Sequence, residues 1–410
     1  MSTSWRVAIF LASFFPLLGL KRGFSIIGIL LALHGWFLLF SRARELWRLP
    51  AFKCQLMLAG GFALPLVLAL PDANFPAHAL QETVMAVAYL PMLISVFWLV
   101  SRHEVVQPFM RISLGIAVFW SLDACLQQLW GRDLFGMTLG DRAGGYWQTQ
   151  AKFGYYMGYF GLFAWLCDLH LNPGRLGRAL AVWSVLTAGV LVGVNREAWL
   201  AYFPASALIF WFGPLRAHPW RWPLALGMVA LAILGFLAGW AWSPHFRVRI
   251  DQTLLVLDGT YEALDAALSH RLGIWLPAWD LSLAHWFNGM GQDGFLLTFL
   301  SVTPDPVHLE WGIQMHPHQV LLEIATTAGL LGFAGIGVAL LALRRAWRLA
   351  DVATRAQAFP FMIYLVALWF PFNTHRSFYS SELMMGNWMM LGFLVAILFR
   401  TRLKQDVIAS

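Results

Sequence analysis

Long apolar segments constrain this chain more than any other feature of its sequence. A helix that crosses a bilayer needs about 17–25 mostly apolar residues, and twelve stretches of the 410-residue chain are apolar over about that length. They lie at 6–20, 24–40, 52–70, 84–101, 108–125, 151–170, 176–194, 196–213, 222–243, 317–343, 358–375 and 383–399. Hydrophobic residues make up 59% of the chain, charged residues 12%, and the mean hydropathy is +0.64. We therefore expect an all-α polytopic integral membrane protein, a single transmembrane domain over 1–410 with about twelve transmembrane helices.

The basic residues are spread over the short connections between these segments. If the N-terminus is cytoplasmic, 18 of the 28 Lys and Arg residues lie in connections on that side and ten on the other. Cytoplasmic loops carry an excess of Lys and Arg, so we expect both termini in the cytoplasm. The charge forms no single basic face, which argues against a nucleic-acid partner. Cys54, Cys125 and Cys167 show no CxxC spacing, and no disulfide framework is expected.

Two connections on the outer side are too long to be simple turns. They are 126–150 and 244–316, and the second is the largest polar segment of the chain. Within it, 251–268 and 270–287 are amphipathic and predict interfacial helices. The second stretch repeats apolar side chains at helical spacing, namely Trp275, Trp279, Leu283 and Trp286. An aromatic belt lying on the bilayer would give the same pattern.

The segment 316–332, HPHQVLLEIATTAGLLG, joins this loop to an apolar span. Pro317 suits a first helical turn because its missing N–H would be unpaired there in any case, so we expect a helix to begin near it. His318 would then lie at the membrane surface, one to two turns from Glu323. A neutral imidazole there can accept a proton from a hydroxyl group. The alternative is a histidine that only caps the helix or hydrogen-bonds lipid headgroups.

Four cations are expected on the same outer side as His318: Arg142, Lys152, Arg196 and Arg271. An Arg near the hydrocarbon is costly unless it is paired or faces a cavity. Glu197 could be the partner of Arg196 and nothing more. Arg271 is the only Lys or Arg between Arg249 and Arg344 and belongs to no solvated charge run. Such a group suits a phosphorylated lipid, because guanidinium groups bind phosphate oxygens and stabilise a pyrophosphate leaving group.

Two patterns resemble ligand sites and are read differently. Gly289 to Gly294 matches GxGxxG, yet no strand precedes it, so we interpret it as a turn. His316 and His318 have an HxH spacing, and further ligand types are near in sequence: His308, Glu310 and Glu323. Because we find neither a carboxylate cluster nor a helix-spaced histidine pair in the sequence, we predict no metal and no cofactor.

Motifs in the second half of the chain resemble those of the bacterial O-antigen ligases. His318-Gln-Val-Leu-Leu-Glu323 followed by Gly329-Leu-Leu-Gly332 is similar to the family's His-Asn-x-x-Leu with a later Gly-x-x-Gly. Ser269-His270-Arg271 with Trp275 is similar to its Ser-Gly-Arg with a Trp four residues on. Asn288-Gly289-Met-Gly291 resembles its Asn-Pro-hydrophobic-Gly-x-Gly. The wider group also contains O-antigen polymerases and bacterial O-oligosaccharyltransferases.

The first half carries weaker forms of two further motifs. Arg142-Ala-Gly-Gly to Gln150-Ala-Lys152 resembles an Arg-x-x-Gly to Asn-Pro-Asn signature, and Asn195-Arg196 resembles the family's Ser-Arg. The chain departs from the family at Gln319 in place of Asn, at His270 in place of Gly, and in the loss of the Asn-Pro-Asn core.

The resemblance implies a GT-C-like glycosyltransferase at the periplasmic face of the bacterial inner membrane. The implied donor is O-antigen on undecaprenyl pyrophosphate, the acceptor is lipid A–core oligosaccharide, and the reaction is inverting and metal-independent. His318 would be the general base, with His316 as second choice. Arg196 and Arg271 would hold the pyrophosphate. The implied substrate-binding residues are Lys152, Arg142, His316, Glu323 and Trp275.

Two alternatives remain at this point. An O-antigen polymerase or protein O-oligosaccharyltransferase would share the donor and the base but use another acceptor; the one dominant loop before the His-bearing segment favours a ligase. A transporter of lipid-linked glycans would bind the same anion without chemistry. Such a protein is expected to carry charges at mid-membrane and related halves, and this sequence shows neither.

Overall fold

The computed structural model describes residues 1–410 except 21–22, 148–149, 214, 217, 372–376 and 410. The described chain is built from helices, with one isolated β-bridge between Arg132 and Thr138. The all-α fold is thereby confirmed. Gln148 and Thr149 of the first expected loop, and Lys21, Arg22 and Arg376 of the charge count, lie outside the described residues. The chain divides into two compact units, each described by itself below.

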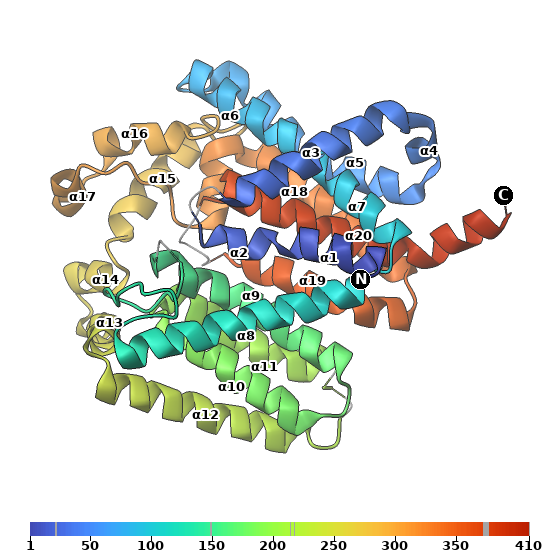
Figure 1. Ribbon diagram of the computed structural model, residues 1–410. Coiled ribbons are helices and arrows are strands. Elements are labelled where there is room, and N and C mark those ends of the chain that lie inside the picture. Colours follow the sequence, from blue (N-terminus) through green and yellow to red (C-terminus); the bar gives the residue numbers. More distant parts are fainter. Residues whose placement is uncertain (21–22, 148–149, 214, 217, 372–376, 410) are drawn as a thin grey trace. The chain divides into compact units, whose positions relative to one another are not determined.

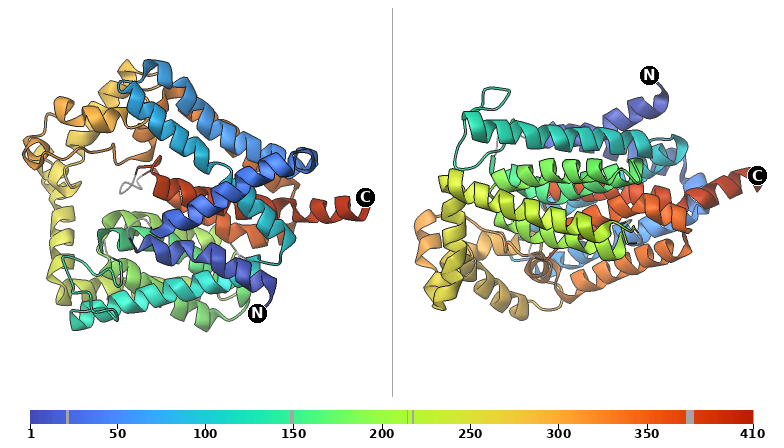
Figure 2. Two further views of the ribbon diagram at one scale, coloured as in Figure 1. Left: turned by 45° about the horizontal axis from the view of Figure 1, so that its top comes forward. Right: turned by 90° about the horizontal axis from the view of Figure 1, so that it is seen from below.

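Unit 1 comprises 1–27, 102–252 and 353–370. Its helices are α1 (Thr3–Ala12), α2 (Phe14–Leu18), α8 (Val106–Trp130), α9 (Gln150–Leu171), α10 (Leu176–Val192), α11 (Arg196–Phe212), α12 (Arg221–Trp242), most of α13 (Pro244–Leu254) and most of α19 (Val352–Leu368). Helices α8 to α11 lie side by side (Figures 1 and 2). Aromatic rings fill the space around α9, with the Phe160 ring 4.1 Å from Phe15 in a tilted arrangement and the Phe163 ring 5.2 Å from Phe361, centroid to centroid.

Unit 2 comprises 28–101, 253–352 and 371–410. Its helices are most of α3 (Gly23–Ser41), α4 (Ala43–Arg48), α5 (Pro50–Leu68), η1 (Leu70–Asp72), α6 (Pro76–Tyr89), α7 (Met92–Arg102), η2 (Leu255–Asp258), α14 (Tyr261–Ala267), α15 (Leu272–Ala284), α16 (Gly294–Val302), α17 (Pro306–Trp311), α18 (Val320–Leu349) and α20 (Ser381–Ala409). The most extensive packing between two helices of this unit is that of α5 against α18. Gly61 and Gly335 meet there so closely that a Cβ on Gly61 would lie 2.4 Å from the Gly335 carbonyl oxygen. Small residues allow such approach between membrane helices.

Seven helical segments of the described chain are long and apolar enough to cross a membrane. They are Gly23–Ser41, Pro50–Asp72, Pro76–Arg102, Val106–Trp130, Arg221–Trp242, Val320–Leu349 and Ser381–Arg400. Three shorter apolar helices are Thr3–Leu18, Leu176–Val192 and Val352–Leu368. The multi-pass class is confirmed, whereas the count of twelve is not. Two expected spans, 151–170 and 196–213, do form helices α9 and α11 but fall outside both sets.

The large polar segment differs in detail from its predicted helices. The stretch 251–268 is not one helix, because Gly259 adopts a left-handed backbone (φ 68°) between η2 and α14. The stretch 270–287 contains α15, which begins two residues later and ends three residues earlier than predicted. Helix α18 begins at Val320 instead of near Pro317. The reason is the Gln319 side chain, which accepts a hydrogen bond from the Leu322 N–H and caps the helix there.

Candidate active site

Two imidazoles and one buried carboxylate meet at the entrance of α18. His316 Nδ1 lies 3.2 Å from Glu323 Oε1, and the Glu323 side chain is only 3% exposed. The second carboxylate oxygen, Oε2, accepts a hydrogen bond of 2.6 Å from the Phe378 N–H. The His316 and His318 rings lie 3.8 Å apart, centroid to centroid. The sequence placed His318 one to two turns from Glu323 and named no partner for the carboxylate; in the structure Glu323 contacts His316.

His316 Nδ1 has two neighbours that make opposite demands on it. It lies 3.2 Å from the Glu323 carboxylate and 3.3 Å from the His318 backbone nitrogen. A single nitrogen cannot donate to the carboxylate and accept from the N–H at once. We assign a proton to Nδ1, because leaving the buried Oε1 of Glu323 without a donor is more costly than a long backbone contact. In that tautomer the lone pair of neutral His316 is on Nε2.

The backbone of His318 is held in a conformation that few side chains adopt. Its φ is 51°, in the left-handed region, which costs a non-glycine residue roughly 1–2 kcal/mol. Residues strained in this way cluster at functional sites. The next residue, Gln319, is held by its own side-chain cap on α18. It therefore caps the helix at the position where the family motif has Asn.

A break in α18 accounts for two of the glycine motifs. Gly329 is non-helical (φ 55°, ψ −145°), and the chain around Trp286 to Gly291 lies against it. The Met290 and Gly291 N–H groups donate to the carbonyls of Thr326 and Thr327, and the Leu330 and Leu331 N–H groups donate to those of Trp286 and Phe287. The loop thus supplies hydrogen-bond partners for the backbone groups that the break in α18 leaves without partners inside the helix.

The two glycines at this crossing have no room for a side chain. A Cβ on Gly289 would lie 2.4 Å from the Ala328 nitrogen, and one on Gly329 would lie 2.6 Å from the Phe287 carbonyl carbon. Both have positive φ, 76° and 55°, a backbone that glycine adopts without strain. The prediction that Gly289–Gly294 forms a turn agrees with the structure, and the turn's partner is the broken helix.

An apolar groove of about 750 Å³ runs between α15 and α18 beside the histidines. Its lining includes Trp275, Trp279, Trp286, Gln319, Gly329 and Phe333. The predicted aromatic stripe therefore forms one wall of the groove. The Trp275 side chain lines the groove, and its indole nitrogen is buried without a hydrogen-bond partner among the described residues.

Arg271 stands at the N-terminus of α15, one turn before Trp275. Its carbonyl oxygen accepts from the Ile274 and Trp275 N–H groups and begins the helix. Ser269 and His270, which precede it, both have φ of 58°. The family's Gly at the position of His270 fits such a backbone. Arg271, Trp275, His316, His318 and Glu323 all belong to unit 2.

The other three predicted cations, Arg142, Lys152 and Arg196, belong to unit 1, and their backbones gather at one end of it. The turn before Arg196 lies against the start of the Lys152 helix, where a Cβ on Gly154 would lie 2.8 Å from the Gly193 oxygen. The Ala143 N–H, next to Arg142, donates to the Val192 carbonyl. The Asn195 side chain accepts from two N–H groups of the first turn of α11 and caps it.

Sequence reasoning missed Arg249 as a site residue. Arg249, in α13, is half-buried and donates to Gln252 Oε1 at 3.0 Å. Burial first, and then the like charge of Arg142, lower the pKa of the Arg249 guanidinium, against the opposing effect of Asp141. Arg142 itself contacts Asp141 Oδ2 at 3.1 Å. No local sequence signal connects Arg142 to Arg249, because the tertiary fold brings together residues that are far apart in the chain.

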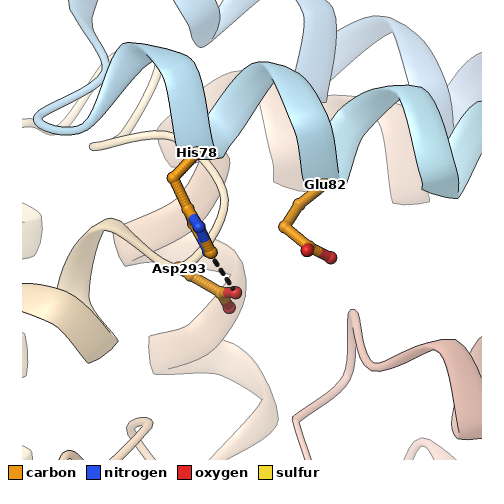
Figure 3. Close-up of side chains that lie close together, drawn as sticks. All are labelled: His78, Glu82 and Asp293. Carbon is orange, nitrogen blue, oxygen red and sulfur yellow. Dashed lines mark hydrogen bonds and ion pairs between the residues drawn. The ribbon is translucent and has the colours of Figure 1, made fainter.

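A group of metal-ligand type also escaped sequence reasoning. His78 and Glu82 lie one turn apart on α6, and Asp293 precedes α16; Figure 3 shows the three side chains facing one another. His78 Nε2 lies 3.1 Å from Asp293 Oδ2. Only the pair on α6 has a recognisable spacing. The third member is more than 200 positions away and is contributed by the fold.

Fold and site together define a multi-pass helical membrane protein with an imidazole–carboxylate group at a helix entrance, beside an apolar groove. Residues 179–337 match the family model of the O-antigen ligases. The match runs from α10 to the middle of α18 and includes Arg196, Arg271, His318 and Glu323. It supports membership of the O-antigen ligase superfamily, of ligases and polymerases, that the motifs predicted. No curated protein matches this chain.

Proposed function

We propose that this protein transfers O-antigen from undecaprenyl pyrophosphate to lipid A–core oligosaccharide at the periplasmic face of the bacterial inner membrane, and so completes lipopolysaccharide. The observation that carries the proposal is the His316–His318–Glu323 group beside the apolar groove. An amphiphilic substrate needs a polar reaction centre next to an apolar channel, and this end of α18 offers both. Both termini are then cytoplasmic.

In the proposed reaction His318 is the general base. It takes the proton of the acceptor sugar hydroxyl, whose oxygen attacks the anomeric carbon of the donor sugar. The bond from that carbon to the phosphate oxygen breaks, and undecaprenyl pyrophosphate leaves with the electron pair. The anomeric carbon inverts, and the proton stays on the imidazole. General base catalysis of this kind is worth roughly 10²–10⁴ in rate.

His316 is a positioning residue in this scheme. Glu323 holds its Nδ1–H at 3.2 Å, and its ring lies against that of His318 at 3.8 Å. A carboxylate that fixes one imidazole nitrogen orients the ring, as in other acid–base sites. His316 is also the second candidate for the base, because its Nε2 carries the lone pair in the assigned tautomer.

The cations are proposed to bind the pyrophosphate and stabilise the charge that it gains. The family motifs assign this role to Arg271 and Arg196, with Lys152 and Arg142 in support. Guanidinium groups match phosphate oxygens in geometry and charge. The reaction is proposed to need no divalent cation at the reacting atoms, since these side chains supply the positive charge.

The groove between α15 and α18 is proposed to hold part of the donor's polyprenyl chain. Its walls are Trp, Leu and Phe side chains, and burying apolar surface stabilises binding by about 25 cal/mol per Å². The Trp275 ring lines this groove and would contact the chain of the bound donor. Trp275 therefore serves as a substrate-binding residue.

In vitro transfer tests this function. Purified protein is mixed with polyprenyl-pyrophosphate glycan and lipid A–core without added Mg²⁺ or Mn²⁺, and the product is read as a gel shift of the lipopolysaccharide. Wild type should transfer and His318→Ala should not. If glycan chains instead lengthen on the polyprenyl carrier, or move to protein, the polymerase or O-oligosaccharyltransferase function replaces the ligase. If glycan is transferred to no acceptor, the transporter function replaces the ligase.

A further inference from the structure

Four ionisable side chains gather behind the start of α15, away from the groove. They are Asp265 in α14, His270 in the link to α15, and Asp305 and His308 at the start of α17; we call them the aspartate–histidine cluster. The side chains of Asp265 and Asp305 are 8% and 10% exposed, and that of His308 is 1% exposed. Two carboxylates buried this deeply need compensating positive charge.

The potential ligand atoms of three members surround a common point. His270 Nδ1 lies 3.0 Å from Asp265 Oδ2 and 3.9 Å from Asp305 Oδ2, and all three atoms lie within 4.8 Å of one another. Metal bonds of about 2.0–2.2 Å in a tetrahedron place ligand atoms roughly 3.3–3.6 Å apart. The observed separations bracket that range, so small side-chain rotations bring all three atoms to one ion.

One carboxylate oxygen in this cluster lacks a donor. Asp305 Oδ2 is buried and has no hydrogen-bond partner among the described residues. The nearest imidazole nitrogens, His308 Nε2 at 3.6 Å and His270 Nδ1 at 3.9 Å, are beyond hydrogen-bond distance. His308 Nε2 donates instead to the His270 carbonyl at 2.6 Å. Asp305 Oδ1 accepts a hydrogen bond from the Val307 N–H and caps α17. Of the two carboxylate oxygens, Oδ2 is therefore the one that could bind an ion.

We propose that Asp265, His270 and Asp305 bind a structural divalent transition metal, with Zn²⁺ as the fitting ion. Mg²⁺ and Ca²⁺ prefer oxygen ligands alone, whereas an imidazole nitrogen with two carboxylates suits zinc. His270 is 32% exposed, which leaves a path for the ion and a water ligand. His308 supports the site by fixing the His270 carbonyl.

Such a metal would fasten two loops around the start of α15. Asp265 Oδ1 accepts from the Leu272 N–H at 2.9 Å, and Thr303 Oγ1 donates to the Gly273 carbonyl at 3.2 Å. A Cβ on Gly273 would lie 2.6 Å from the Asp305 Cβ, so the two loops are in close contact. The ion would hold the left-handed backbone at Ser269 and His270, and with it the place of Arg271.

The His78–Glu82–Asp293 group provides an internal control (Figure 3). The side chains of His78 and Asp293 are 38% and 28% exposed, and none of its three members has a buried polar atom without a partner among the described residues. This group has the residue types of a metal site, but it lacks a buried polar atom that would need an ion as its partner. We therefore expect it to hold no zinc under conditions in which the aspartate–histidine cluster does.

Zinc content of the purified, tag-free protein tests the site. The protein in detergent is stripped with a chelator, given ZnCl₂ in the presence of excess MgCl₂, desalted, and analysed for metal by mass spectrometry. Wild type and His78→Asn should retain about one zinc per chain, as a tetrahedral site does, and His270→Gly and Asp305→Asn should retain none. Co²⁺ in place of Zn²⁺ should give visible absorption bands in wild type and His78→Asn, and none in His270→Gly and Asp305→Asn.

His270→Gly is the decisive variant because glycine suits the left-handed backbone at this position and should leave the fold intact. An unchanged elution profile in size-exclusion chromatography checks this. Wild type without zinc, or zinc retained by both His270→Gly and Asp305→Asn, would overturn the proposal. The measurement needs no glycan substrate, so it stands whether or not the proposed transferase activity is observed.

Discussion

The Nδ1 atom of His316 lies 3.2 Å from the Oε1 atom of buried Glu323, across the first turn of α18. The pair forms only because the helix begins at Val320 and leaves His316 free to turn back toward the helix. A carboxylate placed in this way selects one tautomer of the imidazole and fixes its orientation.

Glu323→Gln should lower kcat on the order of 10²-fold, because the neutral amide no longer holds the His316 proton and the imidazole pair loses its orientation. The Gln side chain keeps the size of Glu and can still accept from the Phe378 N–H. Initial-rate kinetics of the transfer reaction would show the loss in kcat with KM little changed. A variant with wild-type kcat would remove Glu323 from the mechanism.

His318→Asn should abolish transfer while the protein stays folded. Asn tolerates the left-handed backbone that His318 adopts, but it cannot accept the acceptor's proton, so kcat should fall roughly 10²–10⁴-fold. His316→Asn is the matched variant and should retain measurable activity with altered pH dependence. If His316→Asn is the dead variant and His318→Asn is active, the base is His316.

Gly329→Ala and Gly289→Ala should each destabilise the protein by roughly 1–2 kcal/mol or more, since a Cβ meets backbone atoms at 2.6 and 2.4 Å and the backbone is left-handed. The midpoint of thermal unfolding in detergent measures the effect. Gly60→Ala is the control on α5, with open space around its Cβ. Equal unfolding midpoints for Gly329→Ala and Gly60→Ala would mean that the break in α18 is not constrained as described.

Ala325→Trp should fill the groove beside the histidines and raise KM for the polyprenyl donor, because Ala325 lines it. Overfilling an apolar space forces neighbouring side chains out of their rotamers. Leu341→Trp is the control, at a 60% exposed position on the same helix. Equal KM values for the two variants, measured with donors of full chain length, would place the polyprenyl chain elsewhere.

Arg249→Gln should raise KM for the donor roughly 10-fold if the cations of unit 1 bind pyrophosphate, since a charged hydrogen bond contributes about 1.5–3 kcal/mol. Arg249 lies near Arg142 and its pKa is lowered by burial and by that like charge. Arg247→Gln is the control; Arg247 is exposed and donates to the Trp240 carbonyl. A KM unchanged in both variants would separate Arg249 from donor binding.

Much of the fold could be predicted from the residues because its cause is local. Apolar segments such as 24–40, 108–125 and 222–243 become helices wherever they are placed in a bilayer, and α3, α8 and α12 match them within a few residues. Their number could not be predicted as reliably. The segment 196–213, for example, forms α11, which begins with two charged residues, Arg196 and Glu197, and belongs neither to the seven spans nor to the shorter apolar helices.

The sequence by itself determined the class of protein, the family motifs and the residue types available for chemistry. Tertiary structure decided which of these residues meet. Glu323 pairs with His316 because the Gln319 cap makes the helix begin later. Gly289 has no room for a side chain because the broken turn of α18 lies against it. Asp265, His270 and Asp305 come together only when two loops fold behind α15. Contacts of this kind depend on long-range packing, whose free energy is shared among many residues and is not written in any local pattern.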